Sequence, residues 1–224
     1  MKKFLSLVLL MALMFPFAAR ADEVTIGTAM DASYTHPFAL DYKNSWTEAI
    51  YYSHEIGGGG LITEISFYCT NAQARSCQDL RIYMGVSEKG SQTSTTGWLP
   101  ESELTLVYQG PSDLTLGQEV GWQTFELDEP FVYDDADNLI VAVGRVSDNY
   151  TYSQKWAYTW TDNAVLYRQN DYNSAVGYYP GNAQGYQSSK RANIKLKMNP
   201  MGGGWKSKGN GGNDYGFRLC LPQN

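Results

Sequence analysis

Histidine and cysteine are scarce in this chain of 224 residues, which contains two His and three Cys. His36 and His54 stand in no H-E-x-x-H or similar ligand spacing, which argues against a histidine-based metal site. No G-x-S-x-G sequence occurs, which argues against a standard α/β hydrolase. With no catalytic motif, the sequence favours a protein that is not an enzyme.

Basic residues are also few: 17 Lys and Arg face 23 Asp and Glu, for a net charge of −6. Proteins that bind nucleic acid need clustered Lys and Arg to neutralise phosphates, so we expect no nucleic-acid partner. An anionic membrane surface is disfavoured for the same reason.

The longest apolar stretch, residues 4–17, is too short to span a bilayer. Lys2 and Lys3 precede it, and Ala19-Arg20-Ala21 follows as an A-x-A cleavage site, so residues 1–21 are predicted to be a secretory signal peptide. Removal of Lys2, Lys3 and Arg20 lowers the net charge to −9. We expect a monomer, without a transmembrane segment, that is secreted, periplasmic or at the cell surface.

Aromatic residues and glycine are plentiful: 17 Tyr, 6 Trp and 22 Gly accompany only 18% charged residues. This composition is typical of short β-strands joined by turns. Strand-like runs occupy residues 61–69, 79–86, 104–108, 122–127, 138–143, 156–160, 164–168 and 192–198. The sequence therefore predicts an all-β fold, a two-sheet antiparallel β-sandwich of jelly-roll type, over residues 22–199. Residues 200–224 form a Gly-rich tail, predicted to be a flexible tether or the remnant of a truncated second domain.

Two of the three cysteines flank the polar segment 70–76, which separates two strand-like runs. A hairpin would bring Cys69 and Cys77 together, and an exported protein folds in an oxidising compartment. We therefore expect a Cys69–Cys77 disulfide, with Cys220 left unpaired.

The order of strands and turns over residues 24–198 resembles a jelly-roll-like N-terminal module of exported and surface proteins of Gram-negative anaerobes. The residues that carry this resemblance are Ile26-Gly27, Ile65 to Tyr68, Ile82 to Gly85, Trp98-Leu99-Pro100, Gly121-Trp122, Pro130-Phe131, Asn138 to Val143 and Asn193-Ile194. The resemblance implies an accessory or adhesive module and no catalytic residue.

A shorter resemblance lies in residues 215–221, which are similar to the closing strand of formylglycine-generating-enzyme-like domains. Such domains need a much longer chain and upstream reactive cysteines, and neither is present. We therefore interpret these residues as a remnant or a coincidence and assign them no oxidase chemistry.

Aromatic residues gather between residues 150 and 186, where they suit the apolar faces of sugar rings. Tyr172, Tyr178, Tyr179 and Tyr186 lie in a polar, loop-like stretch and are the best candidates for ligand stacking, with Gln169 and Asn170 as hydrogen-bonding amides. Trp156, Tyr158 and Trp160 alternate along one strand, and for these three we favour core packing.

Carboxylates suggest two further sites. Asp134, Asp135 and Asp137 offer oxygen ligands for a structural calcium ion, but their spacing lacks the EF-hand pattern and favours a solvated turn. Scattered residues including Glu48, Glu55, Glu64, Glu101 and Glu103 provide carboxylates for a glycoside hydrolase only if the fold pairs two of them across a cleft.

The sequence therefore predicts an exported, non-catalytic binding or adhesion module, with carbohydrate as the first ligand class. A structural module that adheres to other proteins is the alternative. A secreted glycoside hydrolase, or an accessory of one, comes third.

Overall fold

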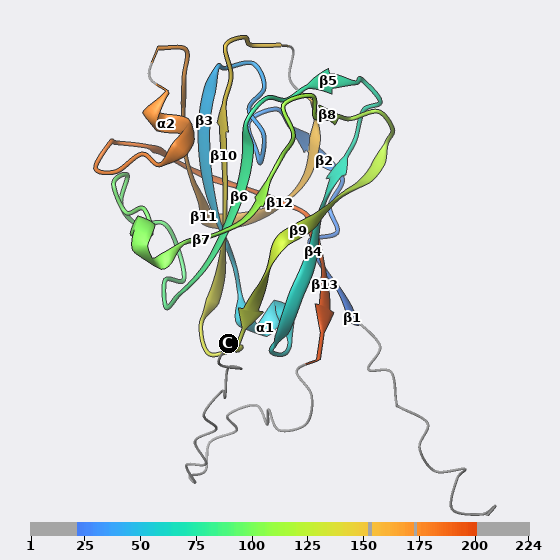
Figure 1. Cartoon of the computed structure of the whole chain (residues 1–224). Helices are drawn as coiled ribbons and strands as arrows, with labels where there is room; N and C mark the ends of the chain where they lie inside the picture. The colour runs from blue at the N-terminus through green and yellow to red at the C-terminus, as the bar shows by residue number, and fades with distance from the viewer. Residues whose placement is uncertain (1–21, 152–153, 173, 201–224) are drawn as a thin grey trace, which may run out of the picture.

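The computed structural model describes residues 22–151, 154–172 and 174–200, and strands provide most of their regular structure (Figure 1). The strands are β1 (Asp22–Ile26), β2 (Asp31–Ser33), β3 (Asn44–Tyr51), β4 (Gly60–Cys69), β5 (Arg75–Ser76), β6 (Leu80–Ser87), β7 (Thr105–Gln109), β8 (Thr115–Leu116), β9 (Gly121–Tyr133), β10 (Asn138–Val146), β11 (Trp156–Asn170), β12 (Tyr186–Ala192) and β13 (Ile194–Asn199). Two four-residue helices, α1 (Ser53–Ile56) and α2 (Ala175–Tyr178), and one 3-10 turn (Glu101–Glu103) complete the fold. Within this part of the chain, no helix has the length and apolar character needed to cross a bilayer.

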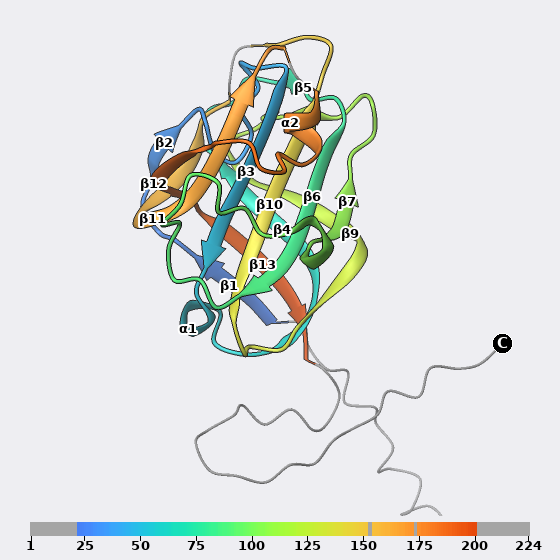
Figure 2. The same ribbon diagram turned by 90° about the vertical axis from the view of Figure 1, so that its left-hand side faces the viewer.

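Eleven strands form one antiparallel sheet that folds over into two layers, as the two views show (Figures 1 and 2). The first layer has the order β1-β13-β4-β9, and the second has β11-β3-β10-β6-β7. A single bridge between Trp156 and Cys69 joins β11 to β4, while β2 and β12 also pair with β11. The strands β5 and β8 form a separate two-stranded ribbon. The predicted all-β sandwich is confirmed.

Alternation along the strands builds the core between the two layers. Ile65 and Phe67 of β4 point inward, as do Val141 of β10 and Val165 of β11, and all four side chains are buried in one apolar cluster. Phe38, from the segment before β3, packs edge-on against Phe67 with ring centres 5.2 Å apart. Burial of this cluster is the main stabilising term of the fold.

A cover of two segments, residues 88–104 and the described residues of 171–185 (173 is not among them), encloses the outer face of the second layer. Trp98 from the first segment is buried in one cluster with Trp46 of β3 and Leu166 of β11, and its indole Nε1 donates to the Ala183 carbonyl of the second segment at 2.8 Å. The first segment overlaps the Ser/Thr/Gly-rich stretch 87–96 and the second overlaps the Tyr/Gly/Asn-rich stretch 170–189, both of which the sequence predicts to be long loops. In the structure both are packed onto the sheet.

The predicted Cys69–Cys77 disulfide is wrong, because both thiols are free and buried. The two strands that flank segment 70–76 do not form a hairpin: β4 pairs with β9 and β13 in the first layer, whereas β6 pairs with β10 and β7 in the second. The Cys69 thiol instead donates to Gln154 Oε1 at 3.3 Å. Cys220 lies outside the described residues.

The predicted core packing of three aromatic residues on β11 holds only in part. Trp156 is fully buried and Tyr158 is half-buried, but Trp160 is 66% exposed. The pairing of β11 with β12 is irregular between Trp160 and Val165, and Asn163 has a φ of 46° there. This irregularity lets one strand serve both the core and the surface.

Both ends of the described domain lie at one end of the sandwich (Figure 1). Asp22 of β1 is opposite Met198 of β13, and Asn199 is opposite Leu61 at the start of β4. The other end of β4, at Cys69, pairs with the start of β9 at Gly121. The chain therefore enters and leaves the fold far from the beginning of β9.

Candidate functional site

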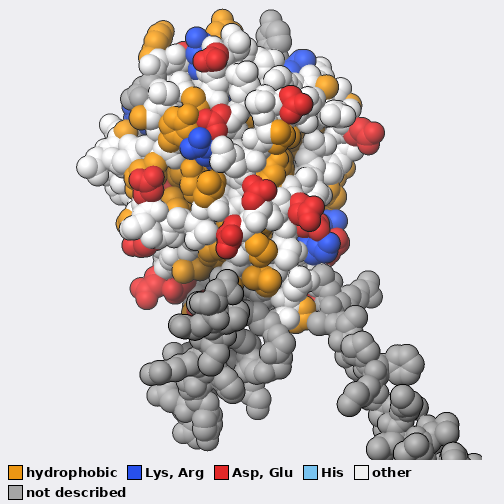
Figure 3. Space-filling view, in the orientation of Figure 1, with side chains coloured by type: hydrophobic (Ala, Val, Ile, Leu, Met, Phe, Trp, Pro, Cys, Tyr) orange, Lys and Arg blue, Asp and Glu red, His pale blue; other side chains and the backbone are white. Residues whose placement is uncertain are grey.

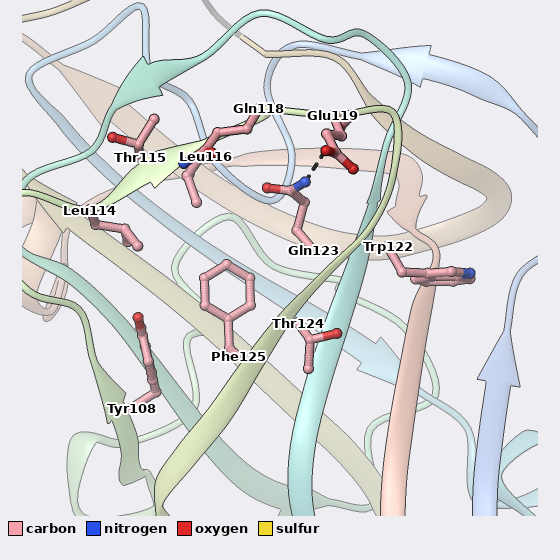
Figure 4. Close-up of a pocket in the computed structure, with 10 residues that line it drawn as sticks. All are labelled: Tyr108, Leu114, Thr115, Leu116, Gln118, Glu119, Trp122, Gln123, Thr124 and Phe125. Carbon is pink, nitrogen blue, oxygen red and sulfur yellow. Dashed lines mark hydrogen bonds between the residues drawn. The ribbon is translucent and has the colours of Figure 1, made fainter.

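A hollow of about 310 Å³ opens where β7, β8 and the beginning of β9 meet, at the end of the sandwich away from Asp22 (Figure 4). Its volume is at the lower end of the range for small-ligand pockets, roughly 300–1,000 Å³. Ten residues line it: Tyr108, Leu114, Thr115, Leu116, Gln118, Glu119, Trp122, Gln123, Thr124 and Phe125.

The floor of the hollow is apolar and aromatic. Phe125 points inward from β9 because alternate residues of that strand face the core, and it is only 4% exposed. The Tyr108 ring of β7 packs edge-on against it, with centres 5.2 Å apart, and Leu114 and Leu116 lie beside the two rings (Figure 4). These contacts fix the rings before any ligand arrives.

The rim is polar and is held by a short turn between β8 and β9. Gln123 Oε1 accepts the Gly117 backbone N–H at 3.0 Å, and Gln123 Nε2 donates to the Glu119 carbonyl at 3.4 Å. Gly117 and Gly121 bound the turn with φ values of 67° and 136°, a backbone region that favours glycine. The side chains of Gln118 and Glu119 therefore stand exposed on a fixed turn.

The charge of the hollow is negative. Glu119 is a carboxylate on the rim, and the ten residues around the hollow include no Lys, Arg or His. Burial raises the pKa of the Tyr108 hydroxyl, and the nearby Asp128 acts in the same direction, so this hydroxyl stays neutral at physiological pH. The molecular face seen in Figure 3 likewise carries Asp and Glu side chains among a few Lys and Arg.

Trp122 connects the hollow to the outer face of the first layer. Its side chain points away from Phe125 (Figure 4), onto a polar sheet surface. There the Tyr68 ring meets the indole edge-on at 5.3 Å, and the Lys195 ammonium lies 5.3 Å from the indole centre. Next to them, the Ser66 and Thr124 hydroxyls are 2.9 Å apart.

The four tyrosines predicted from the sequence do not line the hollow, and they make separate contacts. Tyr172 is 96% exposed, and Tyr178 lies under the Arg81 guanidinium at 4.3 Å. Tyr179 packs against Trp46 and donates its hydroxyl to the Leu99 carbonyl at 3.1 Å. Tyr186 is exposed and lies against Tyr167, with ring centres 5.6 Å apart.

The two predicted amides lie at the end of β11, where their backbones pair with β3. Asn170 Oδ1 accepts the Tyr172 backbone N–H at 3.1 Å. Gln169 Oε1 is buried and has no hydrogen-bond partner among the residues that the structure describes. Asn170 therefore shapes the turn that carries Tyr172, and the proposed ligand role of both amides stays a prediction.

The aspartate cluster has the geometry of a turn. Asp134 Oδ1 accepts the Ala136 backbone N–H at 3.1 Å, and Asp135 has a φ of 62°. In the described part of the chain, no three His, Cys, Asp or Glu side chains converge to hold a metal ion, and the set Asp134, Asp135 and Asp137 is no exception.

The scattered glutamates do not meet across a cleft. Glu48 is buried under the cover, Glu55 binds the buried Arg191, and Glu64 binds Lys197, while Glu101 and Glu103 are exposed on the 3-10 turn. None of the five lines the hollow, where Glu119 is the carboxylate.

The sequence did not reveal the hollow, although all of its residues lie between 108 and 125, because its pattern does not show that β7 and β9 turn the rings of Tyr108 and Phe125 toward each other. A local signal existed in the run from Leu116 to Trp122, where two glycines bracket Gln118 and Glu119 immediately before an aromatic residue. No family model matches this chain, and no curated protein matches it at a significant level.

Proposed function

We propose that this chain is a non-catalytic carbohydrate-binding module and that the hollow beside β9 is its binding site. The observation that supports this proposal is an aromatic floor, Tyr108 and Phe125, under a rim of amide, hydroxyl and carboxylate groups. Sugar rings present apolar C–H faces to aromatic planes and hydroxyls to polar side chains, so this arrangement is complementary to them. Export to the cell surface or beyond is part of the same proposal.

The first experiment is a glycan array probed with residues 22–224 and with the double variant Gln118→Ala, Glu119→Ala. Both side chains are exposed, so their removal changes the rim without opening the core. We expect specific signals from the parent protein that the double variant loses.

The matched control is the double variant Tyr172→Ala, Tyr186→Ala, which removes two exposed aromatics from the stretch that sequence analysis favoured. Retention of the signals in this control supports the hollow as the site. Loss in the control alone moves the site to residues 169–186, and a blank array with natively folded protein rejects carbohydrate binding as the main role.

Adhesion to another protein is the second candidate function. Exposed apolar side chains near the β2–β11 edge favour it, because Met30 is 59% exposed and Trp160 is 66% exposed. Contiguous patches of exposed apolar side chains commonly mark protein contacts. Loss of cell or protein adhesion in the variant Trp160→Ala, with glycan signals absent throughout, supports this alternative.

A further inference from the structure

We infer that the ligand of the hollow is an electrically neutral oligosaccharide, which fills the hollow with one sugar unit and continues over Trp122 onto the outer face of the first layer. This inference rests on the proposed function and specifies its ligand class. It concerns the outward-facing surface that begins at Trp122 and Thr124, at the margin of the hollow, and that a single sugar unit does not cover.

The first argument is the alternation of side chains along β9. Gln123 and Phe125 pair with Phe67 and Ile65 of β4 and face inward, so Trp122 and Thr124 face outward. Because residues advance by about 3.3 Å along a strand, Trp122 and Phe125 stand about 10 Å apart along β9. One ligand that touches both rings is therefore longer than one sugar unit.

The second argument is the chemistry of the surface beyond the hollow. Trp122 is half-buried, held edge-on by Tyr68, and so presents an ordered aromatic surface at low entropic cost. The neighbouring Thr124 is exposed, and its hydroxyl lies 2.9 Å from that of the buried Ser66, so the Thr124 hydroxyl is the group that suits a sugar hydroxyl here. An aromatic ring beside an exposed hydroxyl therefore continues, at the outward-facing margin of the hollow, the combination found on its floor and rim.

The third argument is charge. Lys195 lies 3.5 Å from Glu23, and Lys197 binds Glu64, so each of these outward-facing ammonium groups is offset by a carboxylate. The rim of the hollow contributes Glu119 and no cation. An anionic sugar, such as a uronate or a sulfated unit, meets repulsion from Glu119 at the rim and finds both of these ammonium groups already paired, whereas a neutral chain meets no such repulsion.

The test measures affinity by calorimetry for neutral gluco-, manno- and galacto-oligosaccharides, from monosaccharide to hexasaccharide, and for the matching uronates. We expect the parent protein to bind one neutral series, with an affinity that rises about tenfold or more between the monosaccharide and the longer chains. We expect this binding to change little with added sodium chloride, because no ion pair forms.

Trp122→Ala is the informative variant. We expect it to lower the affinity for the longer chains about tenfold more than the affinity for the monosaccharide. Trp122→Tyr keeps an aromatic ring and restores much of the gain with length, which separates stacking from loss of fold. Tyr150→Ala, which removes a 65% exposed aromatic residue elsewhere, leaves both affinities unchanged.

Three results overturn the inference while leaving the proposed function intact: no gain in affinity with chain length, an equal loss for short and long chains in Trp122→Ala, or tighter binding of the uronates. Failure of every saccharide to bind natively folded protein instead rejects the proposed function itself.

Discussion

Glu48 is a carboxyl group held out of water between the second layer and its cover. Trp46 Nε1 donates to Oε1 and the Leu99 backbone N–H donates to Oε2, both at 3.0 Å. Burial raises the pKa of Glu48 to about 7, although these two hydrogen bonds and the Lys89 charge act in the opposite direction. One side chain thus ties β3 to residues 97–104.

The raised pKa of Glu48 predicts a pH dependence of stability. Because the folded chain binds this proton more tightly than the unfolded chain, the contribution is fully present below about pH 4.5 and is lost as the pH rises through about 7. Glu48→Gln does not titrate. We therefore expect the stability of the parent protein to fall relative to that of the variant over this range, as measured by thermal unfolding at each pH.

His36 is expected to show the opposite dependence of stability on pH, and it therefore serves as a control for Glu48. Burial lowers the pKa of its imidazole to about 3, with a further lowering by the Lys190 charge, so its contribution to stability is present above about pH 6.5 and is lost as the pH falls. His36→Gln removes that loss. If both variants change the pH profile in the same direction, the environments described for these two residues are incorrect.

Because the thiols of Cys69 and Cys77 are free, we predict that reducing agents do not change the stability of the fold. Burial raises the pKa of the Cys77 thiol to about 11, despite the neighbouring Arg145, and also raises that of Cys69. We expect a Cys220→Ser protein to show the same unfolding midpoint with and without dithiothreitol, and its thiols to react with a thiol reagent only in denaturant. Loss of a real disulfide would cost roughly 2–5 kcal/mol and lower that midpoint.

Because the cover packs on the outer face of the second layer, β3 is buried on both faces. This explains why the sequence pattern did not reveal β3 as a strand. The strand β3 carries Thr47, Ala49 and Tyr51 toward the core and Trp46, Glu48 and Ile50 toward the cover, and all eight of its residues are buried. A strand buried on both faces lacks the alternation of polar and apolar residues that reveals a half-exposed strand. By contrast, β4 and β10 were predictable from alternation and from a continuous apolar run.

Removal of the Trp98 side chain tests how much the packing of the cover contributes to the stability of the fold. Trp98→Ala leaves a cavity against Trp46 and breaks the hydrogen bond to Ala183, so we expect a loss of roughly 3–5 kcal/mol, measured by urea unfolding. We also expect faster proteolysis within residues 88–104. Trp160→Ala is the matched control: its side chain is 66% exposed, so the change should stay within about 0.5 kcal/mol.

Across the whole molecule, one core joins both layers, and this predicts cooperative unfolding. A single apolar cluster contains side chains from β4, β9 and β13 of the first layer and from β3, β6 and β10 of the second. Neither layer buries its apolar face alone. We expect tryptophan fluorescence and far-ultraviolet circular dichroism to give coincident urea transitions. Separate transitions would indicate that the layers unfold independently.

The fold class followed from composition and strand spacing, but the hollow did not. Tyr108 and Phe125 each look like core residues of separate strands, and only the meeting of β7 with β9 aligns their rings. The four tyrosines between residues 172 and 186 are close in sequence, yet Tyr178 and Tyr179 contact different neighbours. The residues of the hollow, all between 108 and 125, are equally close in sequence, so closeness alone does not predict which side chains converge.

The position of Asp22 beside Met198 has a practical consequence for display of the domain. Both ends of the described domain lie at the pole where β4 begins, and the mouth of the hollow lies near the pole where β4 ends, about 30 Å away along this ten-residue strand. A bead, fluorophore or fused protein joined directly before Asp22 or after Asn199 leaves that mouth pointing into solution. An array or sensor built on the described domain is therefore free to use either of these two positions.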